Sequence, residues 1–100
     1  MSRPDAGIPP GLVTEARAGD DLALRRLVEA AYTRVRRWAL VHTGDPMEAD
    51  DLSQDVMVKM LRKLHTFEGN ARFDTWLYAM TRNAARDRIR RRRKHDDPGR

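Results

Sequence analysis

The sequence DPMEADDLSQDVMVKMLRKL occupies positions 45–64 and predicts an α-helix over about residues 47–64. Its apolar residues recur at intervals of three and four, which places them on one face of a helix. The central stripe consists of Leu52, Val56, Met60 and Leu64. Asp45 is expected to cap the helix, and the acidic residues that follow suit the positive end of the helix dipole. Basic residues gather at the opposite end, where the dipole favours them: Lys59, Arg62 and Lys63.

Two further helices are expected on the N-terminal side of this one. Residues 21–42 have helical periodicity, and Gly44 and Pro46 stop the helix because glycine favours a left-handed closing turn and proline cannot continue a helix. A short helix is expected over about residues 11–17, ended by Gly19, with Asp20 or Asp21 as the cap of the next one. The expected apolar face of the long helix is Leu24, Val28, Ala31, Val35, Trp38 and His42.

A fourth helix is expected on the C-terminal side, after a polar, glycine-containing loop at residues 66–72. It should begin at a cap on Asp74 or Thr75 and run to about Arg93. Its apolar stripe is Phe73, Leu77, Met80 and Ala84, with Ile89 as a loose extension. Beyond Ala84 the stripe gives way to charge, so this end should project from the domain. The sequence therefore predicts an all-α fold, a compact bundle of about four helices with a projecting basic C-terminal helix.

The composition excludes several classes of protein and site. The chain has 100 residues, enough for one small domain, and residues 1–10 should form a flexible arm. It has no cysteine, which excludes disulfides and thiol chemistry and fits a reducing cytosol. No apolar stretch approaches the roughly 20 residues that span a membrane. The three histidines, His42, His65 and His95, are far apart and lack metal-ligand spacing. We expect no enzyme activity, no catalytic residue, no metal and no cofactor.

Positive charge is concentrated at the C-terminal end. Residues 72–100 contain ten Lys/Arg and four Asp/Glu, a net charge of +6, whereas residues 1–71 have a net charge of −1. This asymmetry favours a polyanionic partner, with a solvated basic tail as the alternative. Trp76 and Asn83 are two helical turns apart and point to a similar side. Aromatic rings stack on bases, an asparagine can read one base edge, and arginines pair with phosphates.

Three segments, DDLSQDV at 50–56, RFDTWLY at 72–78 and RNAARDRIRR at 82–91, together with Phe67, resemble region two of bacterial sigma factors. The short extracytoplasmic-function (ECF) group fits best. The resemblance covers about residues 12–95 and rests on the order and spacing of the three motifs. It implies a sigma region two domain at residues 11–95 of a cytoplasmic transcription initiation factor. It also implies that residues 96–100 begin a linker to a C-terminal domain that is absent here.

The resemblance implies a surface for core RNA polymerase. In the family, the helix with the acidic motif docks on the clamp helices of the β′ subunit. The matching residues here are Asp51, Gln54 and Asp55, with Met57 and Leu61 on the adjoining surface. The family usually has glutamate where this chain has Asp55, which keeps the charge but shortens its reach.

The resemblance also implies a site for the promoter −10 element. In the family, the loop before the last helix captures a base flipped from the non-template strand. That loop corresponds here to His65, Thr66, Phe67, Glu68, Gly69, Asn70, Ala71 and Arg72. The helix that follows contributes Trp76, Arg82, Asn83, Arg86 and Arg90, with Asn83 where a base-contacting amide is expected. For Trp76 both burial and stacking on DNA remain open.

Three other classes of protein compete with this interpretation. They are a stand-alone helical DNA-binding module such as a three-helix repressor, a single-strand or RNA-binding domain, and a protein-interaction bundle whose basic tail is incidental. None of them needs polymerase, and a repressor predicts a neutral or basic helix at 47–64 in place of an acid-rich one. An anti-sigma factor is a common partner in the sigma family, although no residue of this chain identifies one.

Overall fold

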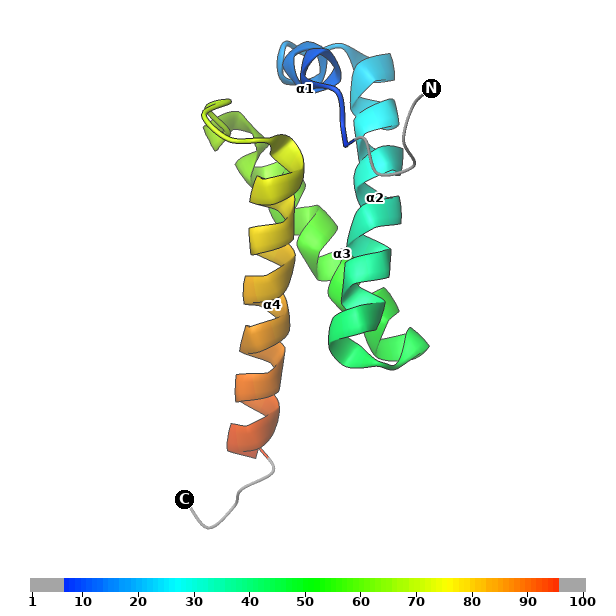
Figure 1. Cartoon of the computed structure of the whole chain (residues 1–100), viewed down its shortest axis with the longest axis vertical. Helices are drawn as coiled ribbons and strands as arrows, with labels where there is room; N and C mark the ends of the chain where they lie inside the picture. Colours follow the sequence, from blue (N-terminus) through cyan, green and yellow to red (C-terminus); the bar gives the residue numbers. More distant parts are fainter. Residues whose placement is uncertain (1–6, 96–100) are drawn as a thin grey trace.

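The computed structural model describes residues 7–95, with side chains as far as Arg93. Five helical elements follow one another in the order α1 (Pro10–Arg17), α2 (Asp21–Thr43), α3 (Pro46–Lys63), the 3₁₀ helix η1 (Leu64–Thr66) and α4 (Phe73–His95) (Figure 1). No strand occurs among these described residues, so the all-α prediction is confirmed. Residues 1–6 of the expected arm and the expected linker at 96–100 lie outside the described residues.

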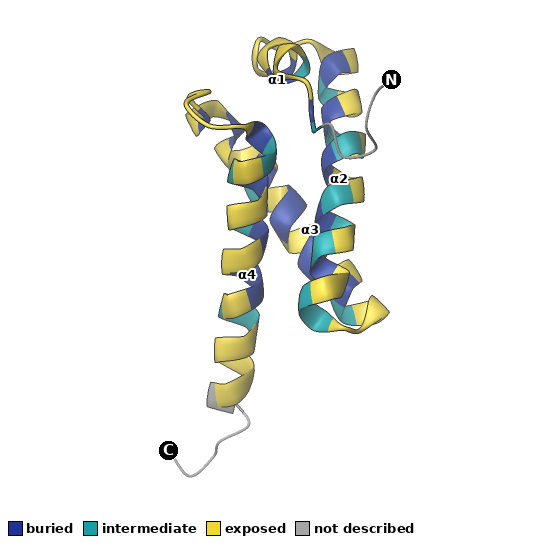
Figure 2. Ribbon diagram, viewed as in Figure 1, coloured by how far each residue is buried: buried dark blue, intermediate teal, exposed yellow. Residues whose placement is uncertain are grey.

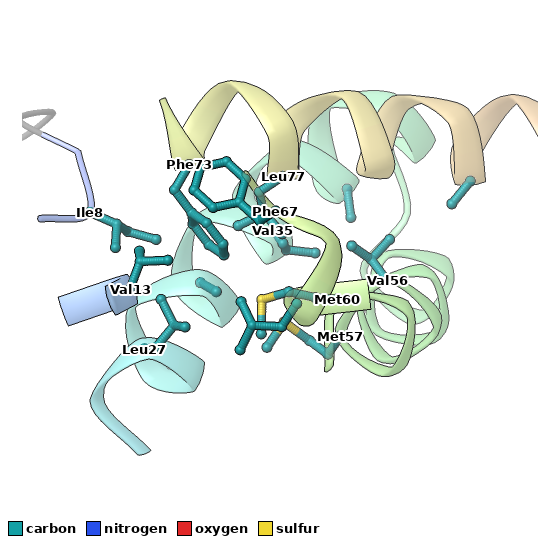
Figure 3. Close-up of a cluster of buried hydrophobic side chains, with 14 of the residues drawn as sticks. Ile8, Val13, Leu27, Val35, Val56, Met57, Met60, Phe67, Phe73 and Leu77 are labelled. Atoms are coloured by element: carbon teal, nitrogen blue, oxygen red, sulfur yellow. The ribbon is translucent and has the colours of Figure 1, made fainter. Parts of the chain in front are cut away.

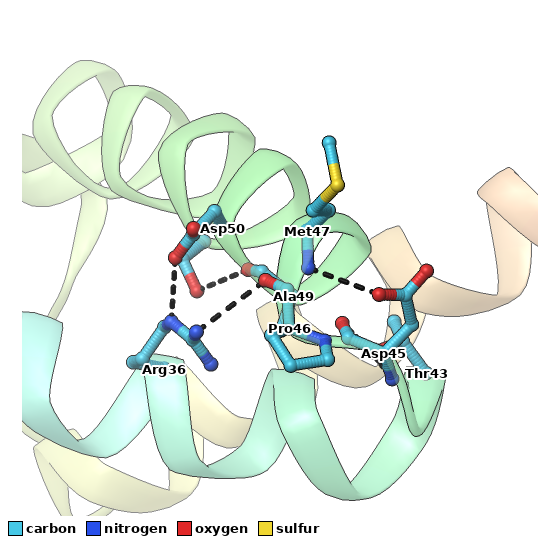
Figure 4. A network of polar contacts seen from close by, with 8 residues as sticks. Arg36, Thr43, Asp45, Pro46, Met47, Ala49 and Asp50 are labelled. Carbon is cyan, nitrogen blue, oxygen red and sulfur yellow. Dashed lines mark hydrogen bonds and ion pairs between the residues drawn. The ribbon is translucent and has the colours of Figure 1, made fainter.

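The ends of α2 and α3 follow local capping rules. The Asp20 Oδ1 atom accepts a hydrogen bond from the Ala23 N–H at 2.9 Å, which confirms Asp20 as the cap of α2. Gly44 closes α2 with a φ of +68°, in the left-handed region that glycine tolerates best. The Asp45 Oδ1 atom then accepts from the Met47 N–H at 3.1 Å and caps α3 (Figure 4). The turn between these long helices is therefore specified by its own residues.

The start of α4 differs from the prediction. The helix begins at Phe73, and neither Asp74 nor Thr75 is its cap. The Asp74 carboxylate instead accepts hydrogen bonds from the Ile8 N–H and from Arg34 Nε, both at 3.0 Å. The carboxylate thus binds residues from distant parts of the sequence instead of capping its own helix.

The predicted face of α2 is confirmed at Ala31 and Val35, which are fully buried, but on either side of them the buried face is shifted by one position. The fully buried line is Ala23, Leu27, Ala31, Val35 and Ala39. Leu24, Val28 and Trp38 of the predicted stripe are only partly buried and flank this line. Because α2 is contacted by α1, α3 and α4, small alanines occupy the line of closest approach and larger side chains cover its edges.

The core lies between α2, α3 and α4 (Figure 3). Leu52, Val56, Met60 and Leu64 are all buried, as predicted for α3. On α4, Phe73, Leu77 and Ala84 are buried as expected and Met80 packs against the core. The predicted extension to Ile89 is wrong, because this side chain is 48% exposed. The buried stripe of α4 ends at Ala85 instead.

Two hydroxyl side chains are buried without loss of hydrogen bonding. The Ser53 Oγ atom donates to the Ala49 carbonyl at 2.7 Å, and the Thr81 Oγ1 atom donates to the Leu77 carbonyl at 3.0 Å. Both residues are fully buried. A hydroxyl that bonds back to the preceding helical turn can be buried at little cost. Because serine and threonine are polar, a prediction based on apolar periodicity did not place Ser53 and Thr81 in the core.

The C-terminal part of α4 extends past the ends of its neighbours, and most of its surface is exposed (Figure 2). It is nevertheless tied to α3 by two ion pairs. Arg88 contacts Asp55 at 3.2 Å, and Arg92 pairs with Glu48. The predicted projection of the basic helix is confirmed, with these two arginines linking it back to the bundle.

Candidate functional site

A cavity of about 700 Å³ lies between the loop at residues 67–72 and the N-terminal part of the chain. Phe67 and Phe73 line it from one side, and Ile8 and Val13 line it from the other. Polar groups are contributed by Thr14, Arg17, Glu68, Asn70 and Arg72. The cavity therefore combines aromatic walls with two cations, a carboxylate, a hydroxyl and an amide, which suits a flat, polar-edged ligand.

A cluster of three aromatic rings supports this loop. The ring centroids of Phe67, Phe73 and Trp76 are 5.2–5.3 Å apart in all three pairs. Phe67 is only 7% exposed and belongs to the hydrophobic core. The structure thus places Phe67 mainly as an anchor that holds the loop, with one edge lining the cavity.

A second hollow, the basic groove, runs between the end of α3 and the first half of α4. Lys59, Arg62 and Lys63 line it from α3, and Trp76, Met80 and Asn83 line it from α4. Asp87 is the single acidic residue among the groove's lining residues. Trp76 is half-buried: its ring packs against the aromatic cluster, and part of it also lines this groove. Trp76 is therefore partly buried, and stacking of its exposed part on DNA stays a prediction.

The remaining predicted residues of α4 lie beside the basic groove. Arg82, Arg86 and Arg90 are exposed, and the helical repeat places them on the face adjoining that of Asn83. Arg90 pairs with Asp87 at 3.4 Å within the same helix. These three arginines can meet a charged backbone without disturbing the core, since none of them is buried.

The loop residues divide into two groups. Residues 67–72 line the cavity, whereas His65 and Thr66 do not. The His65 carbonyl accepts a hydrogen bond from Arg17 Nη2 at 3.2 Å, and the Thr66 hydroxyl donates to the Lys63 carbonyl at 2.6 Å. These two residues thus close the end of α3 and connect it to α1.

The exposed face of α3 carries the expected acidic patch. Asp51, Gln54 and Asp55 are exposed, and Leu61 is 47% exposed. Met57 is 8% exposed and packs in the core, so the prediction that it lies on this surface is wrong. The next residue, Val58, is 47% exposed and takes that position. Because successive helical residues are about 100° apart, a shift of one residue exchanges a core position for a surface position.

Several acidic residues of α3 are paired within the molecule. Arg36 Nε contacts Asp50 Oδ1 at 2.7 Å, and Arg36 Nη2 donates to the Pro46 carbonyl at 3.3 Å (Figure 4). Arg88 pairs with Asp55. Asp51, in contrast, has no ion pair among the interactions of the described residues. The acidic face is thus partly neutralised by α2 and α4.

Sequence reasoning missed two groups of lining residues. Lys59, Arg62 and Lys63 were visible as a basic cluster, and their spacing of three and four residues already placed them on one face. Because they were assigned to the helix dipole, the groove that they line was not predicted. The N-terminal group, Ile8, Val13, Thr14 and Arg17, has no such signal, because its partners are about 60 residues away in the sequence.

Neither a metal site nor a membrane span is found in the described part of the chain. No three His, Cys, Asp or Glu residues within it are grouped to hold a metal ion. None of its helices has the length and apolar character needed to cross a bilayer.

Comparisons with known proteins agree on one family. The chain matches the sigma-70 region 2 family over residues 27–95. It is 32% identical to RNA polymerase sigma-H factor of Pseudomonas aeruginosa and 32% identical to ECF RNA polymerase sigma factor SigM of Mycobacterium tuberculosis, in each case over 78% of this chain and 40% of the relative. ECF RNA polymerase sigma factor SigW of Bacillus subtilis is 26% identical over 81% of this chain and 43% of its own length.

The chain thus spans about two fifths of the length of these relatives. No solved structure matches it significantly. The matched region contains α3, the loop and α4, together with most of α2, and so includes the basic groove, the acidic face and the loop side of the cavity. The chain belongs to the sigma-70 region 2 family and is the region 2 domain of an ECF sigma factor.

Proposed function

We propose that this domain binds core RNA polymerase and recognises and melts the promoter −10 element, with one non-template base flipped into the cavity beside the loop. The observation that carries this proposal is the adjacency of two unlike hollows. The aromatic cluster lies between them: Phe67 and Phe73 line the cavity, and Trp76, whose ring contacts both, lines the basic groove. A strand that crosses this cluster can place one base in the cavity and its backbone along the groove.

The chemistry of the two hollows suits different parts of a nucleotide. The cavity offers aromatic and apolar walls with Asn70 and Arg17 for a base edge. The basic groove offers three cations for phosphates and the amide of Asn83 for a second base. Flipping a base costs a few kcal/mol, and stacking or trapping that base returns about 1–3 kcal/mol. Phosphate contacts supply the rest of the affinity and make it dependent on salt.

The acidic face of α3 is the proposed docking surface for the β′ clamp helices. Asp51, Gln54 and Asp55 supply polar contacts there, and Val58 and Leu61 supply exposed apolar area beside them. This combination of apolar and charged groups is typical of a specific protein interface, in which charges steer association and fix register. The basic groove lies towards the C-terminal end of the same helix, where Lys59 and Lys63 turn away from Gln54 while Arg62 adjoins the docking face.

The docking proposal is tested by replacing Gln54 and Asp55 together with alanine. We expect binding to core RNA polymerase to weaken at least about tenfold, roughly 1.4 kcal/mol, because both changes remove polar groups from the interface. Affinity is measured by co-elution or by fluorescence anisotropy, with the far-ultraviolet circular dichroism spectrum as a check on folding.

Glu29→Ala is the matched control, because Glu29 is an exposed carboxylate on α2, away from this face. Wild-type affinity in the double variant would contradict the docking site. If the chain binds DNA tightly and sequence-selectively but does not bind polymerase at all, the result favours a stand-alone DNA-binding module instead.

A further inference from the structure

The segment in front of α1 forms a wall of the cavity opposite the loop. Ile8 is buried and belongs to the same core cluster as Phe67 and Phe73. Figure 3 shows Ile8 and Val13 on the side of the two phenylalanine rings that faces the N-terminal segment. Gly7 has a φ of +93°, and a Cβ atom at this position would collide with the Arg72 guanidinium. The segment therefore runs close against the loop.

Asp74 holds this segment in place. One carboxylate oxygen accepts a hydrogen bond from the Ile8 N–H at 3.0 Å, across 66 residues of sequence. The other oxygen accepts from Arg34 Nε at 3.0 Å, and both side chains of this ion pair are 23% exposed. Asp74 thus joins the N-terminal segment, α2 and α4 at one point. Hydrogen bonds to a charged, partly shielded carboxylate are stronger than those between neutral groups.

Arg17 makes the second connection between this wall and the loop side. Its Nη2 atom donates to the His65 carbonyl at 3.2 Å, and its side chain lines the cavity. A guanidinium group has five N–H donors, so it can bond a carbonyl and a base edge together. Thr14 lies one helical turn before Arg17 and also lines the cavity. Its hydroxyl donates to the Pro10 carbonyl at 3.1 Å, so towards a ligand this oxygen can act as an acceptor.

We propose that residues 7–10 and α1 form the second wall of the base-binding cavity, that Asp74 is the positioning residue of this wall, and that Arg17 and Thr14 help to select the captured base. This inference rests on the proposed capture of an unstacked base. It adds a donor and an acceptor that come from outside the loop. Two contacts, one at Asp74 and one at His65, fix the wall before the base arrives. Less conformational entropy is then lost from the protein when the base binds.

The test uses the 100-residue chain and a pool of single-stranded 12-mer DNA randomised at its central positions. Bound sequences reveal the base preferred at each position by the wild type. The preferred oligonucleotide is then remade with an abasic site at each position in turn. For the wild type we expect one position at which removal of the base weakens binding about tenfold, within the range for one stacked base.

Three variants are compared with the wild type at a temperature where each is folded. In Asp74→Ala and Arg17→Ala, we expect the abasic penalty at that position to fall to about twofold and the base preference there to flatten, with penalties elsewhere unchanged. Asp74→Asn retains an oxygen that can accept from the Ile8 N–H and should restore part of the preference. Glu15→Gln, on an exposed part of α1 that does not line the cavity, is the matched control.

Two results would overturn the inference in distinguishable ways. If the wild type shows the abasic penalty and both Asp74→Ala and Arg17→Ala keep it with an unchanged base preference, the N-terminal wall has no role in capture. If no position shows a penalty in the wild type, base capture itself is wrong and the inference falls with it. Because the Arg17 side chain is exposed, we expect Arg17→Ala to fold. This variant therefore decides between the two results if Asp74→Ala does not fold.

Discussion

Under the proposed function, single residues on α4 would divide the recognition of DNA into reading bases and holding the backbone. Asn83 lines the basic groove with Trp76, whereas its neighbour Arg82 lies outside the groove on the adjoining exposed face. An amide can bond the donor and acceptor of one base edge at once, and we expect a guanidinium outside the groove to contact the backbone. Neighbours in sequence are therefore assigned different parts of the interaction.

Replacement of Asn83 by alanine should reduce discrimination at one promoter position by about 1–3 kcal/mol, because one bidentate contact is lost. Replacement of Arg82 by alanine should weaken all sequences about equally, because a phosphate contact has no sequence preference. Competition binding with oligonucleotides that differ at single positions measures both effects. Equal weakening across all sequences by Asn83→Ala would show that Asn83 does not read a base.

At the scale of one element, α3 combines two surfaces of opposite charge. Its exposed N-terminal and middle part presents Asp51, Gln54 and Asp55, and its C-terminal part contributes Lys59, Arg62 and Lys63 to the basic groove. This order agrees with the helix dipole, which favours anions at the start and cations at the end. Under the proposed function, the acidic part of the helix would meet polymerase and its basic end would meet DNA.

The three cations of α3 should contribute to the salt dependence of DNA binding. Each alanine replacement at Lys59, Arg62 or Lys63 should lower the slope of log K against log salt by about 0.7 on single-stranded DNA, because fewer counterions are released. The slope is measured by titration at a series of salt concentrations. Arg25→Ala and Arg26→Ala, on an exposed part of α2, are the controls. An unchanged slope in the triple variant would remove the basic groove from the DNA path.

At the scale of the whole molecule, one core connects the acidic face of α3, the basic groove and the cavity. Leu27 of α2 is fully buried, as are Leu52 and Met60 of α3 and Leu77 of α4. The walls of the cavity and of the groove are formed by residues from α1, α3, α4 and the loop between α3 and α4. Both hollows therefore exist only while these elements are packed together.

Leu27→Ala should destabilise the domain by about 2–5 kcal/mol, because it leaves a void in a fully buried site. For a domain of this size the melting temperature should fall by roughly 10–30 °C. Leu22→Ala is the matched control: the same change at a side chain that is 56% exposed should alter stability by less than about 0.5 kcal/mol. Thermal unfolding followed by circular dichroism measures both. Similar melting temperatures for the two variants would contradict the assigned core.

Much of this protein could be predicted from the sequence, because the signals involved are local. Asp20, Gly44 and Asp45 act on backbone groups within four residues, so helix ends follow from nearby sequence alone. The periodicity of Leu52, Val56, Met60 and Leu64 identified the buried face of α3. The motifs at 50–56, 72–78 and 82–91 indicated the family, which the comparisons confirmed.

Tertiary packing decided what depends on neighbours from elsewhere in the chain. On α2 it buried Ala23, Leu27 and Ala39 in place of the predicted Leu24, Val28 and Trp38. On α3 it buried Met57 and exposed Val58. It used Asp74 to bind Ile8 and Arg34 instead of capping α4. It also brought the N-terminal segment to the loop about 60 residues away, which formed the cavity. Periodicity identifies a helix and its approximate face, but the exact line of contact depends on which other helices approach and how closely their side chains pack.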